Sequence, residues 1–208
     1  LLWQHRTRIG GVMNGLHFCF GIGALCAPAI VAWSLRATEG IAVAYWTIAA
    51  LIVPVAAWFA ALSGPPMPKH AEADSRATAD RVLVGLIATV FAMYAAAEVG
   101  YGGWISTYAA TLRFGDAAEA AYLTSAFWGS LTLGRFVAIP IASRFAPGAV
   151  IGIDLLGAVG CVGAILLYPD SARTVWIGTC VLGFCLASIF PTLLVFSGER
   201  LAVSGRST

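Results

Sequence analysis

Six long apolar stretches dominate this chain and restrict what it can fold into. They cover about residues 9–33, 41–62, 82–108, 118–140, 150–168 and 174–197. A membrane core about 30 Å thick is crossed by roughly 20 helical residues. Backbone groups inside lipid must bond to one another, so such stretches fold as helices, and the alternating pattern of a barrel strand is absent. The sequence therefore predicts an all-α, polytopic bundle of six membrane spans.

The charged residues are too few for a soluble domain of this length. Only 11% of the 208 residues are charged and 60% are hydrophobic, whereas about 25% of an average soluble domain is charged. A formal net charge of +2 gives no basis for a nucleic-acid partner. The expected partners are the lipid bilayer and a small-molecule solute, and no feature predicts a particular oligomeric state.

One long polar segment divides the chain. Residues 63–81 contain three prolines and six Asp, Glu, Lys or Arg residues among small side chains, a composition that predicts a flexible linker in water. The predicted organisation is two spans in 1–62, the linker 63–81, and four spans in 82–208. The chain lacks an initiating Met, and no residue pattern at its end marks the end of a helix or a domain. We therefore expect it to be a fragment of a longer protein.

The basic residues predict the orientation of the spans. If the first span starts in the cytoplasm and the direction then alternates, nine Lys and Arg residues lie in the cytoplasm. Three lie outside, namely Arg36, Arg113 and Arg173. Cytoplasmic loops carry the excess of positive charge in membrane proteins. We therefore expect the linker and both ends of the chain to be cytoplasmic, in a cell (inner) membrane.

Glu98 is the acid that lies deepest within any predicted span. A charged residue at the centre of a membrane helix costs roughly 2.5–3.5 kcal/mol and usually marks a functional site. Tyr94, Tyr101 and Tyr108 recur every seven residues and share a helix face with Glu98. An acid among aromatic rings suits a sugar-like ligand, and it can also carry a coupling proton. The alternative is a carboxylate that pairs with a neighbouring helix for packing alone.

Glycines and prolines interrupt several of the spans. Gly100, Gly102 and Gly103 follow Glu98, and each weakens a helix by roughly 1 kcal/mol relative to Ala. They indicate either a broken helix beside a ligand or close packing of helices. Prolines within three other spans are expected to bend them: Pro28, Pro54 and Pro191.

Three further polar residues lie within spans. Asn14 and His17 are about one turn apart, with His17 on the order of 12 Å from the start of its span. They are expected either to line a cavity or to form hydrogen bonds between helices. Asp154 lies near the cytoplasmic entrance of its span, where we expect it to pair with an arginine such as Arg135.

Motifs of metal, nucleotide and hydrolase chemistry are missing. The five cysteines all lie in apolar stretches without the two-residue spacing of a metal or redox motif. The chain contains neither a His-Glu-x-x-His sequence nor a Walker loop. We therefore expect a protein that is not an enzyme and needs no metal or organic cofactor, although H⁺ or Na⁺ could serve as a coupling ion.

Several segments resemble the major facilitator superfamily of transporters. Gly134, Arg135 and Arg144 resemble the C-terminal copy of its cytoplasmic loop motif, without the acid that many members carry between the arginines. Residues 14–24, 97–108 and 127–129 are similar to its sugar-transporting branch, which includes fucose permease-like and sodium-dependent glucose transporter-like proteins. On this resemblance the six spans correspond to family helices five to ten.

The resemblance implies a secondary active transporter that moves a sugar or sugar-like solute by alternating access, with ion coupling expected. Gly134, Arg135 and Arg144 would then belong to the cytoplasmic gate. An efflux antiporter of the same fold for an apolar or drug-like solute is the alternative, and a membrane enzyme or channel is a more distant one. The residues expected to line the transport path are Glu98, Tyr101, Trp104, Tyr108, Trp128, Asn14 and His17.

Overall fold

The computed structural model describes residues 9–62, 81–142 and 144–204, and within these ranges the chain forms seven helices and no strand. The predicted all-helical fold is thus confirmed. The side chains of residues 9–18, 139, 142, 195 and 198–204 lie outside the description. The helices are α1 (Ile9–Thr38), α2 (Ala42–Ala61), α3 (Arg81–Thr111), α4 (Ala117–Ala142), α5 (Pro147–Leu167), α6 (Ala172–Leu186) and α7 (Ile189–Ser204).

Five stretches of the described chain are long and apolar enough to cross a membrane. They are Cys19–Thr38, Ala42–Ala61, Arg81–Thr111, Pro147–Leu167 and Ala172–Leu194, the last of which combines α6 with the start of α7. The protein is therefore an integral, multi-pass membrane protein. The remaining predicted span, α4, is also long enough to cross at 26 residues, but it is less apolar than the others.

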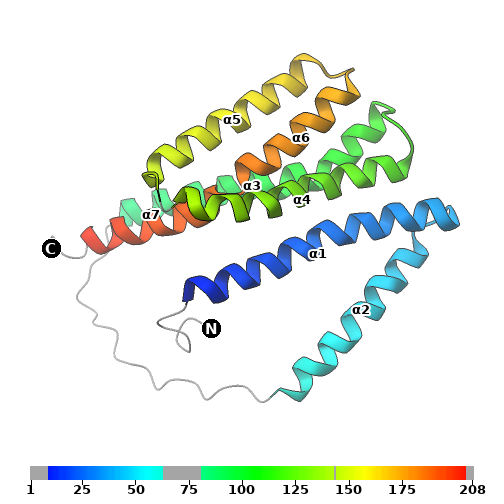
Figure 1. Cartoon of the computed structure of the whole chain (residues 1–208), viewed down its shortest axis with the longest axis horizontal. Coiled ribbons are helices and arrows are strands. Elements are labelled where there is room, and N and C mark those ends of the chain that lie inside the picture. Colours follow the sequence, from blue (N-terminus) through cyan, green and yellow to red (C-terminus); the bar gives the residue numbers. More distant parts are fainter. Residues whose placement is uncertain (1–8, 63–80, 143, 205–208) are drawn as a thin grey trace.

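Helix α4 lies in the middle of the bundle. It packs against α1, α3 and α6, as Figure 1 shows. Its side chains Phe127 and Leu131 are fully buried in the core that α4 forms with α3 and α6. A helix surrounded by other helices can bury hydroxyl groups and charges that lipid would not tolerate, provided that they are paired.

The helices on the two sides of the linker meet through α1 and α4. Near the start of α4, Glu119 lies 3.9 Å from a guanidinium nitrogen of Arg36. The same guanidinium lies 5.2 Å from the ring centre of Tyr122. Exposed ion pairs of this kind contribute at most about 1 kcal/mol. Most of the contact comes from packing, in which the fully buried Ala32 lies against α4.

The last predicted span is not the continuous helix that we expected over residues 174–197. Helix α6 ends at Leu186 and α7 begins at Ile189. The physical reason is Pro191, because a proline ring clashes with the carbonyl group four residues earlier, here that of Ala187, and has no N–H to donate. Pro28 and Pro54, by contrast, lie inside α1 and α2, which both continue past them.

The glycines beside Glu98 do not break their helix, because α3 runs without interruption from Arg81 to Thr111. Gly102 allows close packing instead. A Cβ atom at this position would lie 2.9 Å from the Trp128 ring, whereas one at Gly100 or Gly103 would meet nothing within 4 Å. The broken-helix interpretation was therefore wrong for α3, and close packing holds for Gly102 alone.

Candidate functional site

A buried ion pair connects α3 to α4. Nη2 of Arg135 lies 3.3 Å from Oε1 of Glu98, and the two side chains are only 17% and 10% exposed. A buried charge that loses its partner is strongly destabilising, which explains why these two side chains lie together. The sequence had left two interpretations of Glu98 open, and its pairing with a neighbouring helix is one of them. The expected pairing of Arg135 with Asp154 was wrong.

One nitrogen of the Arg135 guanidinium has no hydrogen-bond partner among the described residues. Nη1 is buried, and none of the described residues accepts a hydrogen bond from it. Buried side-chain N–H groups nearly always have an acceptor, and hydrogen bonds to charged groups are the strong ones. A ligand oxygen is the kind of acceptor that suits this nitrogen, with the Glu98 carboxylate beside it to accept a hydrogen bond in return.

The tyrosines that share a face with Glu98 contact other helices of the bundle. The Tyr94 hydroxyl donates to the backbone carbonyl of Leu186 at 3.1 Å. The Tyr101 hydroxyl lies 2.8 Å from the Thr179 hydroxyl of α6. Tyr108 is half-buried against the cluster of apolar side chains nearer the end of α3. The packed face of α3 thus contains the acid and its three tyrosines.

The two tryptophans expected in the path differ in position. Trp128 is half-buried between Phe127 and Phe20, at ring-centre distances of 5.3 and 5.9 Å. It also packs on the bare backbone of Gly102, one turn from Glu98. Trp104 points away from this face, with 71% of its surface exposed. The structure therefore brings Trp128, but not Trp104, near the ion pair.

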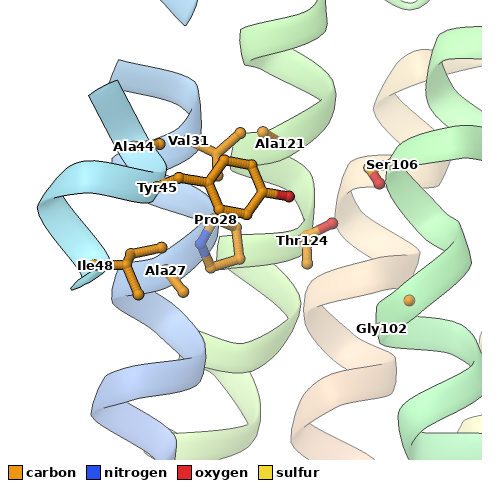
Figure 2. A pocket seen from close by; sticks show the side chains of 11 residues that line it. Ala27, Pro28, Val31, Ala44, Tyr45, Ile48, Gly102, Ser106, Ala121 and Thr124 are labelled. Carbon is orange, nitrogen blue, oxygen red and sulfur yellow. The ribbon is translucent and has the colours of Figure 1, made fainter. Parts of the chain in front are cut away.

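A pocket of about 360 Å³ lies between α1, α2, α3 and α4. Figure 2 shows its side chains, among them the hydroxyl groups of Tyr45, Ser106 and Thr124. The Thr124 hydroxyl oxygen is buried and has no described partner. The lining residues are Ala27, Pro28, Val31, Ala44, Tyr45, Ile48, Gly102, Gly103, Ser106, Ala121 and Thr124.

The pocket and the ion pair lie along one face of α3. Glu98, Gly102 and Ser106 are spaced four residues apart, so they follow one another at steps of about 6 Å along the helix. This spacing alone could have predicted that Ser106 shares a face with Glu98. The hydroxyl groups of Tyr45 and Thr124 come from other helices, and nothing in the local sequence indicates that they face the same pocket.

The other predicted site residues do not join this group. Gly134 packs against the end of α6, where a Cβ atom would lie 2.7 Å from that of Ala187. Arg144 is exposed beyond the end of α4, whereas Arg135 points into the bundle. Positions 14 and 17 belong to α1, but the side chains of Asn14 and His17 lie outside the described part. The gate formed by these motif residues stays a prediction.

Comparison with known proteins relates the chain to membrane transporters. It is 28% identical to sodium-dependent glucose transporter 1A of Mus musculus over 94% of this chain and 55% of the relative. It is 31% identical to human sodium-dependent glucose transporter 1 over 66% of this chain and 26% of the relative. Major facilitator superfamily domain-containing protein 4A of Xenopus tropicalis is 34% identical over 52% and 22%, respectively.

The chain is thus similar to members of the major facilitator superfamily over part of their length. It spans about half the length of the mouse relative and about a quarter of the other two. No protein-family model and no solved structure matches it. This similarity fits the observed bundle of membrane helices and the contact between α1 and α4.

Proposed function

We propose that this chain is part of a secondary active transporter that moves a sugar or sugar-like solute by alternating access, coupled to H⁺ or Na⁺. The observation that carries the proposal is the buried Glu98–Arg135 pair, in which one guanidinium nitrogen has no partner within the described part of the chain. Charges inside membrane helices mark solute and ion pathways. Two relatives are sodium-dependent glucose transporters, which supports the choice of solute and of ion coupling.

The pair suits a sugar hydroxyl because a hydroxyl group both donates and accepts. It can donate to the Glu98 carboxylate and accept from Nη1 of Arg135 at the same time. Each hydrogen bond to a charged group contributes about 1.5–3 kcal/mol. The Trp128 ring beside Gly102 offers an apolar surface on which the CH face of a sugar ring can pack.

The pocket provides an approach to the pair along α3. Its lining is mostly small and apolar, with three hydroxyl groups that can bond a passing solute. Gly103 leaves space open here, because a Cβ atom at this position would meet nothing within 4 Å. In this account the solute passes the Tyr45, Ser106 and Thr124 hydroxyl groups before it reaches Glu98 and Arg135.

Counterflow tests this function. Full-length protein in liposomes preloaded with unlabelled D-glucose should take up radiolabelled D-glucose transiently, because alternating access exchanges solute without net flux. L-glucose outside should compete poorly. If wild-type protein shows no stereoselective counterflow of D-glucose or of any related monosaccharide, the proposed sugar transport is wrong. Efflux of an apolar solute by the same fold is then the remaining interpretation.

The orientation of the chain follows from its basic residues. We propose that residues 63–81 face the cytoplasm of the cell, with both ends of the chain on the same side. A full-length Ala73→Cys variant, in a background without other reactive cysteines, should resist impermeant thiol reagents in intact cells and react after lysis. Arg113→Cys, on the opposite side, is the matched control and should react in intact cells. The reverse labelling pattern would overturn the orientation.

A further inference from the structure

The break in the last span lies inside the bundle. Ala187 and Ser188, which separate α6 from α7, are both buried. The end of a helix leaves backbone carbonyl groups without helical partners, and the start of the next helix leaves N–H groups likewise. Inside a membrane these groups need other partners. Discontinuous helices of this kind hold coupling ions in secondary transporters.

Side chains from two other helices converge on this break. The Tyr94 hydroxyl of α3 donates to the carbonyl of Leu186 at 3.1 Å. The Ser188 hydroxyl donates to the carboxylate of Asp154, which lies on α5. Asp154 therefore faces a helix end within the bundle instead of the arginine that the sequence suggested.

Asp154 differs from Glu98 in that no described cationic side chain pairs with it. Among the described residues, the ion pairs are Glu98–Arg135 and Arg36–Glu119, and neither involves Asp154. The other groups that face Asp154 are the Ser188 hydroxyl, at the start of α7, and the Cys185 thiol of α6. The start of α7 adds a partial positive charge on the side of Ser188.

We propose that Asp154 and Ser188 form the site of the coupling ion, a monovalent cation that is either a proton or Na⁺. This inference rests on the proposed transport function. A carboxylate can take up one proton or bind Na⁺ through its oxygens, with the Ser188 hydroxyl as a further oxygen group. The described residues contain no group of three or more His, Cys, Asp or Glu, as a transition-metal site would need.

The position of the site explains how the ion could drive movement. An unloaded Asp154 carries a net charge that is costly to enclose between α5 and α7, so it favours an arrangement with access to water. Loading neutralises this charge and favours the packed arrangement. Because Pro191 removes one backbone hydrogen bond between α6 and α7, the span can bend at this point.

Tyr94 links this site to the solute site. Its hydroxyl bonds the last residue of α6, Leu186. The same side chain lies close enough to Glu98 and Arg135 for electrostatic interaction with both. One aromatic side chain thus contacts the ion pair and the helix break, which gives a physical route between ion binding and solute binding.

The test separates ion coupling from solute exchange in the full-length protein. Asp154→Asn keeps the acceptor for Ser188 but removes the charge, so D-glucose counterflow should stay within about threefold of wild type. Accumulation driven by an imposed gradient should be lost. A pH gradient and a Na⁺ gradient, applied in separate liposome preparations, show which cation the wild-type protein uses. Ser188→Ala should weaken the dependence on that cation by about tenfold.

Glu119→Gln is the matched control, because it removes an exposed acid of the described chain. It should change neither assay. Asp154→Asn protein that accumulates D-glucose like wild type contradicts the inference. The Asp154→Asn protein could also melt like wild type and lose both accumulation and counterflow. That result would indicate a structural role for Asp154 and would contradict the inference too. Wild-type protein without counterflow would overturn the transport function, and the ion site with it.

Discussion

Arg135→Ala in the full-length protein is expected to lower the free energy of unfolding by about 3–5 kcal/mol, because it leaves the Glu98 carboxylate buried without its cation. Thermal unfolding in detergent measures this effect as a lower melting temperature. The double variant Glu98→Gln/Arg135→Gln removes both charges and should recover much of the lost stability. It should not recover solute binding, since neither charged hydrogen-bonding group remains.

The single and double variants together separate two roles of Arg135. A residue that acts only in a cytoplasmic gate would leave stability unchanged and slow transport. An Arg135→Ala protein as stable as wild type would therefore contradict the buried pair and favour the gate that the loop motif predicts. A double variant less stable than the single one would also contradict the account, because it would show that the two charges do not compensate each other.

Glu98→Gln is expected to weaken D-glucose binding by about tenfold to 150-fold, which corresponds to about 1.5–3 kcal/mol for a hydrogen bond to a charged group. Equilibrium binding of radiolabelled D-glucose to purified full-length protein measures this loss. At saturating solute, gradient-driven accumulation should persist, because the coupling ion binds at Asp154. Loss of accumulation with unaltered affinity would instead assign the coupling ion to Glu98.

A second Glu→Gln variant controls for the loss of an ion-paired acid in general. Glu119 also pairs with an arginine, but its side chain is 49% exposed. Such a pair contributes at most about 1 kcal/mol, so Glu119→Gln should bind D-glucose as wild type does. Equal losses for both variants would show that the effect is not specific to the buried pair.

The sequence predicted the helical membrane fold because long apolar stretches have few alternatives in lipid. It also indicated that Glu98 and its tyrosines share one helix face, which the packing of α3 bears out. The partner of Glu98 could not be predicted in the same way. Arg135 lies 37 residues away, and its position at the end of a span suggested a loop motif instead.

The helix break shows a different limit. Pro191 predicted a bend, and the clash of its ring with residue 187 places the interruption. The local sequence could not predict which side chains contact the break, because Tyr94 and Asp154 belong to two other helices. Helix periodicity gives the face of a residue within its own helix, but the opposing helix depends on tertiary packing. The outward position of Trp104 could have been predicted, because six residues place it about 120° from Glu98 around the helix.

The most direct test of the solute site is a structure of the full-length protein with bound D-glucose, determined by cryo-electron microscopy. The account predicts sugar density within hydrogen-bonding distance of both the Glu98 carboxylate and Nη1 of Arg135, next to the Trp128 ring. Sugar density at a separate position, with the Glu98–Arg135 pair closed and Nη1 bonded to another part of the protein, would contradict it.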